Sequence, residues 1–164
     1  MAGQIEANLA AQGITLPDPV SPIADYVPFV RTGNLVFVSG QVPKSADGMI
    51  TGQLSASDHA ADGVPAPGSL MGVAVGAATL CALNVLAQLK ACVGDLDNVV
   101  RVVKLTGFVN CDGTFEQQPQ VINGASSLMI GVFGEAGQHA RAAVGSSSLP
   151  GGAIVEVEAI FEVV

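Results

Sequence analysis

The C-terminal stretch Ala140–Phe161 constrains the fold more than any other part of the chain. Its first part, Ala140–Gly145, is short and apolar and carries one cation, Arg141. A loop rich in Gly, Ser and Pro follows over Ser146–Gly152, and Ile154–Phe161 then alternates apolar and acidic residues. This alternation predicts a half-buried strand, because successive side chains of a strand point to opposite faces. We therefore expect two neighbouring strands that could pair.

One face of the second predicted strand carries two carboxylates. Glu156 and Glu158 are two residues apart, so both point the same way, with Ile154 and Ile160 beside them. Arg141 could face them from the neighbouring strand. Only 12% of the residues are charged, which makes this grouping chemically suggestive. The plain alternative is an ion pair that only holds two strands or two subunits together.

The low charge also bears on what covers the molecule. With 164 residues the chain predicts one domain, and 49% hydrophobic residues supply a substantial core. So few charges indicate a surface that is neutral or covered by further copies of the chain. The formal net charge is −8, and the six Lys and Arg residues are dispersed. Nucleic-acid binders gather cations to neutralise phosphates, so we expect no nucleic-acid partner.

The cysteine residues and the hydropathy of the chain indicate the cellular compartment in which we expect the protein. The three Cys residues form no CxxC motif and are odd in number, which favours a reducing environment, and Cys81 is predicted to be a small core residue. No apolar segment follows a basic N-terminus, so no secretory signal is expected. The apolar stretch Leu70–Leu89 is interrupted by polar residues, which favours a buried helix over a membrane span. We expect a cytoplasmic protein without a membrane partner. His59 has no neighbours at metal-ligand spacing, so no metal is expected.

Periodicity and turn residues predict the remaining elements. In chain order these are a short helix Gln4–Gly13, an extended arm Leu16–Pro28, a hairpin of Val27–Arg31 and Leu35–Ser39, a loop-rich segment Lys44–Gly68, a helix from Ser69 or Gly68 to about Cys92, a strand Val99–Asn110, and a helix of roughly Phe115–Phe133 capped by Asp112 or Thr114. Alternation in the strand places Arg101 and Val103 on one face, and Val102 and Lys104 on the other. The order suggests both long helices on one face of a mixed sheet, with self-association covering the other face.

Four motifs in series carry a resemblance. They are L-V-F-V-S-G-Q-V-P at Leu35–Pro43, D-L-D-N-V-V-R at Asp95–Arg101, F-G-E-A-G-Q-H-A-R-A-A-V-G at Phe133–Gly145, and L-P-G-G-A-I-V-E-V-E-A-I at Leu149–Ile160. From about Tyr26 onward, the chain resembles the Rid/YjgF family, also called the L-PSP endoribonuclease-like family. The resemblance implies a chorismate-mutase-like α+β fold and a homotrimer with an inner β-barrel and three clefts between subunits. We interpret residues 1–164 as one such domain, with a helix and arm at 1–25 and a loop insertion at 44–68.

The resemblance also implies an activity. The best-studied branch of the family hydrolyses reactive enamine and imine acids to 2-keto acids and ammonia, without metal or cofactor. The Arg of its A-R motif, which clamps the substrate carboxylate, corresponds to Arg141. The first Glu of its E-x-E-A-I motif, which positions the hydrolytic water, corresponds to Glu156. A guanidinium fork suits a small carboxylate-bearing substrate, and a neighbouring carboxylate at Glu158 could raise one pKa.

Four further positions match residues that line the family's cleft. Tyr26 matches a Tyr of the N-terminal segment, Ser39 and Gly40 match the S-G-Q turn, and Asn123 resembles an Asn on the second helix. Each also has a plain interpretation, as an interface aromatic, a strand-end residue or a helix brace. His139 is interpreted as a surface or interface residue.

Some features depart from the family pattern. The insertion at 44–68 replaces a short loop, extra residues precede the second helix, and Ala143 stands where the family often has Cys. The substrate therefore need not be the imine that the best-studied branch of the family hydrolyses. Two other functions also stay open: a non-catalytic trimer that binds small carboxylates or a protein, and an endoribonuclease or translation inhibitor. The net charge argues against the last.

Overall fold

A five-stranded mixed sheet with helices on one face forms the protein, described by a computed structural model over residues 3–22 and 24–164. Residues 1, 2 and 23, which fall within the predicted N-terminal helix and arm, lie outside the described residues. The main elements are α1 (Gln4–Ala11), β1 (Phe29–Thr32), β2 (Leu35–Gln41), α2 (Leu70–Val93), β5 (Val99–Asn110), α3 (Gln118–Phe133), β6 (Ala140–Ser146) and β7 (Val155–Val163). The mixed α+β architecture is as predicted.

The strand order β1-β2-β7-β5-β6 differs from what the sequence suggested for the C-terminal strands. We expected β6 and β7 to pair, but β5 lies between them and pairs with both, parallel to β6 and antiparallel to β7. The parallel pair is possible because α3 forms the crossover connection that such a pair requires. As a result, Arg141 stands on an edge strand, and β5 and β7 lie between that strand and β2.

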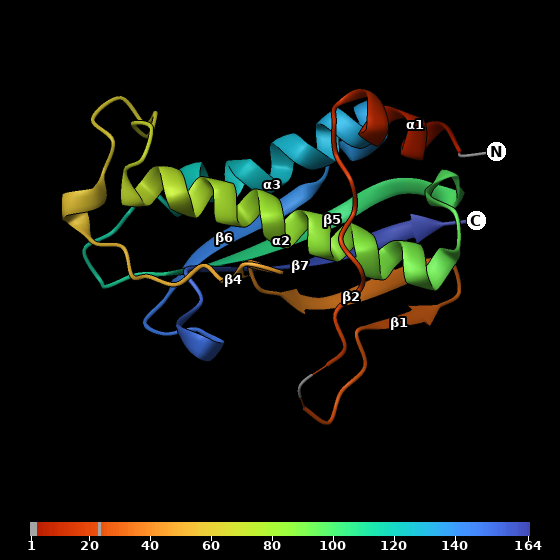
Figure 1. The fold of residues 1–164 in the computed structure, drawn as a ribbon, viewed down its shortest axis with the longest axis horizontal. Helices are drawn as coiled ribbons and strands as arrows, with labels where there is room; N and C mark the ends of the chain where they lie inside the picture. The colour runs from red at the N-terminus through yellow and green to blue at the C-terminus, as the bar shows by residue number, and fades with distance from the viewer. Residues whose placement is uncertain (1–2, 23) are drawn as a thin grey trace.

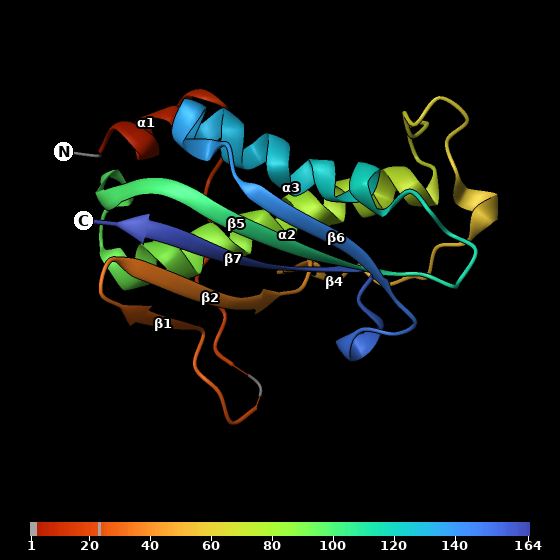
Figure 2. The same cartoon turned by 180° about the vertical axis from the view of Figure 1, so that it is seen from behind.

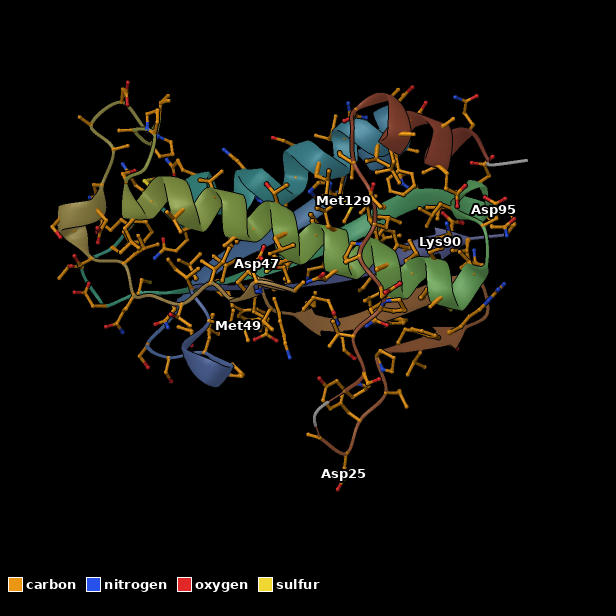
Figure 3. The ribbon with its side chains drawn as sticks, in the orientation of Figure 1. Asp25, Asp47, Met49, Lys90, Asp95 and Met129 are labelled. Atoms are coloured by element: carbon orange, nitrogen blue, oxygen red, sulfur yellow. The ribbon has the colours of Figure 1, made fainter. Side chains whose placement is uncertain are left out.

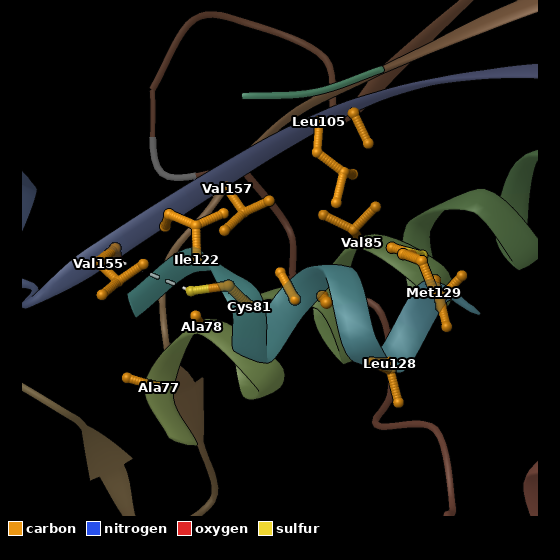
Figure 4. Packing of buried hydrophobic residues seen from close by; sticks show 14 of the residues in the cluster. Ala77, Ala78, Cys81, Val85, Leu105, Ile122, Leu128, Met129, Val155 and Val157 are labelled. Atoms are coloured by element: carbon orange, nitrogen blue, oxygen red, sulfur yellow. Dashed lines mark hydrogen bonds between the residues drawn. The ribbon is translucent and has the colours of Figure 1, made fainter. Parts of the chain in front are cut away.

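Both long helices cover the same face of the sheet. Figure 1 shows α2 and α3 in front of the strands, and the view turned by 180° in Figure 2 shows the strands in front. α2 is long and apolar enough to cross a membrane, yet over half of its most apolar window is buried inside the protein. Figure 4 shows Cys81 among this core, where its thiol donates to the carbonyl of Val155. The predicted core role of Cys81 is confirmed, and the three thiols are free.

The alternation on β7 is as predicted. Its buried side chains face the helices, and they are Val155, Val157, Ala159, Phe161 and Val163. Glu156 and Glu158 alternate with these buried residues and so point to the opposite face. The two long helices do not cover that face (Figure 2). That face also holds Val30, Phe37 and Val144, three exposed apolar side chains. Exposed apolar side chains on an uncovered sheet face call for a partner surface.

Two local predictions were wrong. α3 begins at Gln118 rather than Phe115, because Asp112 accepts from the backbone N–H of Thr114 in a separate turn that buries Phe115. In β5 the register slips between Val102 and Lys104, so one extra residue sits opposite β7. This bulge places Lys104 beside Ile160 on the uncovered face, not with Val102 on the buried one.

The segments outside the sheet are also anchored. Asp97 accepts hydrogen bonds from the first backbone N–H groups of α1, and the nearby Lys90, labelled in Figure 3, pairs with Glu6 at 3.1 Å. The insertion contains a small hairpin, β3 (Lys44–Ser45) and β4 (Gly48–Met49), and it is not wholly loop. Its later part docks on the segment before α3: Gln117 exchanges two hydrogen bonds with Ala60.

Candidate functional site

A cavity of about 560 Å³ lies between the N-terminal arm, the end of β2, the hairpin of the insertion and the loop before β7. Four of the predicted site residues line it, namely Tyr26, Ser39, Gly40 and Glu156. Lys44 and Met49 show that the insertion forms part of the wall. The remaining lining residues are Val20, Ser21, Pro22, Ala24, Pro28, Gln41, Val42, Asn84, Pro150 and Gly151. The cavity is therefore mostly apolar, with one carboxylate.

Glu156 is the acid of this cavity. Its carboxylate lies against the backbone of Gly40, so closely that a Cβ on residue 40 would collide with it. Partial burial, and secondarily the charge of Glu158, raise the pKa of Glu156 above the ordinary value. The expected effect of two like charges is thus present, with burial as the larger cause. A carboxyl whose pKa is raised above its ordinary value keeps its proton to a higher pH, which suits a group that transfers protons.

The arm is tied to the sheet and to α2 beside this carboxylate. Ser39 donates from its hydroxyl to the carbonyl of Val27 at 2.8 Å, and Gln88 donates to the carbonyl of Val20 at 2.7 Å. These contacts hold Tyr26, 48% exposed, at the cavity wall. Ser39 therefore has at least a structural task, and a direct role toward a ligand stays a prediction.

Asn84 is a cavity residue that the sequence analysis did not single out. It is buried in α2 and donates from Nδ2 to the carbonyls of Val42 and Lys44, at 3.0 and 3.1 Å. Its Oδ1 has no hydrogen-bond partner within the described part of the chain. An Asn among the apolar positions of a helix was the available signal, since a buried amide needs partners.

Arg141 belongs to a second cluster, on the other edge of the sheet. Its Nη1 donates to Oδ1 of Asn123 at 2.9 Å and to Oγ of Ser126 at 3.1 Å, both on α3. Asn123 therefore contacts Arg141 rather than the cavity. Ser126 in turn shares a 3.0 Å hydrogen bond with His139, which was predicted to be only a surface or interface residue.

The two clusters do not meet within one chain. Arg141 is opposite Leu105 on the helix-covered side of β6, whereas Glu156 is opposite Phe108 on the uncovered side of β7. No ion pair joins Arg141 to Glu156 or Glu158 among the described residues. The interpretation of Arg141 as a partner of these carboxylates in the same chain is wrong. The expectation that Arg141 and Glu156 share a site now requires a second copy.

Comparisons with known proteins agree with the fold. Residues 6–162 match the family described as "YjgF/chorismate mutase-like, putative endoribonuclease". Protein TCP17 of Trypanosoma cruzi is 47% identical over 163 residues, which cover 98% of this chain and 95% of that protein. The crystal structure of Atu1372 from Agrobacterium tumefaciens, a protein of unknown function, is 46% identical with a TM-score of 0.82, covering 98% and 92% of the two chains. A "putative endoribonuclease" from Shewanella oneidensis is 26% identical with a TM-score of 0.86, covering 98% and 100%.

Proposed function

Because the chain belongs to the YjgF/chorismate mutase-like family, we propose that it hydrolyses reactive 2-imino and enamine acids to 2-keto acids and ammonia. The observation that carries the proposal is the carboxyl of Glu156, whose pKa is raised, at the wall of a mostly apolar cavity. An imine carbon is already electrophilic, so its hydrolysis needs a held water and a proton carrier. The remaining requirement is a group that binds the substrate carboxylate, and Arg141 supplies it.

In the proposed reaction Arg141 binds the carboxylate of the substrate through two parallel hydrogen bonds. Glu156 accepts a proton from water while the water oxygen bonds to the imine carbon, and the electron pair of the C=N bond moves to nitrogen, which takes up that proton from Glu156. Glu156 then accepts the hydroxyl proton of the carbinolamine and passes it to nitrogen as the C=O bond forms and the C–N bond breaks. The products are one 2-keto acid and one ammonia for each imine and water consumed. An enamine enters after it takes up a proton at carbon and loses one from nitrogen, which converts it to the imine.

The proposed site is shared between copies. The cavity lies at the end of β2 and the start of β7, and Arg141 lies on the edge strand β6, so a head-to-tail arrangement would bring the Arg141 cluster of one copy to the cavity of the next. Such contacts close into a ring when the rotation permits. We propose a trimer whose uncovered sheet faces form the inner barrel. The exposed Phe37, at 41%, and Val144, at 44%, would be covered there.

The test couples the protein to a dehydratase that releases 2-aminoacrylate, and follows formation of pyruvate. We expect acceleration by the wild type, a loss of about 100-fold or more in kcat/KM for Arg141→Ala, and a similar loss in kcat for Glu156→Gln. Glu158→Gln is the matched control, since it removes a carboxylate from the same face of β7, and it should stay within about threefold of wild type.

Other outcomes decide against the proposal. No acceleration, together with binding of pyruvate by calorimetry, would indicate a carboxylate-binding module. Full activity of Arg141→Ala would show that the cation is not the anchor. Cleavage of RNA by protein freed of contaminating nucleases, lost in Glu156→Gln, would favour the endoribonuclease named in the family description.

A further inference from the structure

The guanidinium of Arg141 makes hydrogen bonds through only one of its three nitrogen atoms within the described chain. The Nη1 nitrogen has two hydrogens, and it has two acceptors, Asn123 at 2.9 Å and Ser126 at 3.1 Å. Nε and Nη2 make no hydrogen bond with the residues that the structure describes. Three N–H groups of the guanidinium therefore remain, and the Nε–Nη2 edge is the side-on fork that matches a carboxylate.

The proton positions in the cluster follow from one backbone carbonyl. Nδ1 of His139 is 2.6 Å from the carbonyl oxygen of Gly137, and a carbonyl oxygen only accepts, so Nδ1 carries the hydrogen. In the neutral ring Nε2 is then an acceptor, and the hydroxyl of Ser126 donates to it at 3.0 Å. The hydrogen of Ser126 points toward His139, which leaves the oxygen lone pairs free to accept from Arg141.

The carbonyl group of Gly137, which accepts the first of these hydrogen bonds, is fixed by packing. Gly137 is buried, and a Cβ there would collide with the backbone carbonyl of Met129 in α3. The turn before β6 is therefore pressed against the helix that carries Asn123 and Ser126. The guanidinium is consequently held by groups from α3, the turn and β6 together.

We propose that Ser126 and His139 are positioning residues that hold the Nη1 end of Arg141 and leave its Nε–Nη2 edge free for the substrate carboxylate. The inference rests on the proposed function and adds two residues to its site. A long exposed side chain samples many rotamers, and fixing one in advance removes an ordering cost from ligand binding. The role acts on binding of the carboxylate and not on the chemical step, so it affects KM and leaves kcat nearly unchanged.

The experiment measures the affinity for pyruvate by calorimetry and the kinetics with 2-aminoacrylate. Ser126→Ala should weaken pyruvate binding about 10-fold and raise KM by a similar factor, with kcat within about twofold. Ser126→Thr keeps a hydroxyl and should restore affinity to within about threefold of wild type. His139→Phe, which removes both ring nitrogens, should weaken binding about fivefold. Ser127→Ala changes the next, exposed serine of α3 and should behave as wild type.

Two results would overturn the inference, and they are distinct. If Ser126→Ala binds pyruvate as wild type while Arg141→Ala does not, the positioning role is wrong and the proposed function stands. If Arg141→Ala also binds as wild type, the anchor itself is wrong and the proposed function fails with it. A Ser126→Ala protein that loses kcat and melting temperature together, without rescue by Ser126→Thr, would show a purely structural role.

Discussion

Glu156 shows how a neighbouring glycine, Gly40, can affect the pKa of a carboxylate. Gly40 allows the carboxylate to lie against its backbone, which removes water from one side of the acid. This partial burial, aided by the charge of Glu158, raises the pKa of Glu156. The same effect that favours proton transfer also has a cost, because a partly desolvated charge destabilises the folded protein.

This cost predicts how stability depends on pH. The pKa of Glu156 is higher in the folded than in the unfolded state, so its favourable contribution is complete below the unfolded pKa of about 4.3 and is lost as pH rises through the folded pKa. Glu156→Gln is neutral throughout. Its melting temperature should match wild type near pH 4 and exceed it by about 1–3 °C at pH 7, a small gain because the carboxyl keeps some water.

The control for this measurement is Glu116→Gln, which neutralises an exposed acid that does not line the cavity. The difference in melting temperature between Glu116→Gln and wild type should not grow between pH 4 and pH 7. A Glu156→Gln protein that is less stable than wild type at pH 7 would show that the carboxylate makes a favourable contact and that its burial does not destabilise the fold.

At the scale of elements, local pattern predicted strands and helices better than it predicted their neighbours. The bounds of β5 are those expected, and β6 and β7 both exist. Their pairing could not be read from the sequence, because alternation shows which face is buried but not which strand lies alongside. The bulge in β5 was missed for a related reason: one extra residue leaves no periodic signal.

The residues of the candidate site likewise fall into those that the sequence predicted and those that it did not. Motif positions found Tyr26, Ser39, Gly40 and Glu156, which the fold brings to one cavity. Ser126 was missed, because its contact with Arg141 exists only once α3 packs beside β6. Contacts between elements are set by packing, and a single sequence does not display them.

The contact between α2 and α3 predicts a stability effect. Gly124 lies where a Cβ would collide with the backbone carbonyl of Val75, and Thr79 Oγ1 would be 2.9 Å away. A backbone atom cannot turn aside as a side chain can, so Gly124→Ala must separate the helices. We expect a loss of about 1–3 kcal/mol, measured by urea unfolding.

Gly76→Ala is the matched control, since it lies on α2 and nothing lies within 4 Å of its added Cβ. It should raise stability by about 0.5–1 kcal/mol through helix propensity alone. If Gly124→Ala were equally stabilising, the close approach of the two helices would be wrong.

At the scale of the whole molecule, one fact organises the others: the guanidinium of Arg141 stands on the edge strand β6 and the carboxylate of Glu156 on the central strand β7, on opposite faces of one sheet. The uncovered sheet face and the low charge both suit association with further copies. The proposed shared site would account for the free Nε–Nη2 edge of Arg141 and for the absence of Arg among the cavity's lining residues in the described chain. A site made by two copies also makes assembly a condition of activity.

This condition can be tested by mixing two inactive proteins. Arg141→Ala chains keep Glu156, and Glu156→Gln chains keep Arg141, so a site formed between one copy of each holds both groups. After dissociation and reassembly at equal amounts, about one site in four should be complete, and about a quarter of wild-type activity should return. The same proteins mixed without dissociation should stay inactive, as should each alone after the same treatment. If native mass spectrometry shows mixed trimers that remain inactive, the proposed site between Arg141 of one copy and Glu156 of the next is wrong.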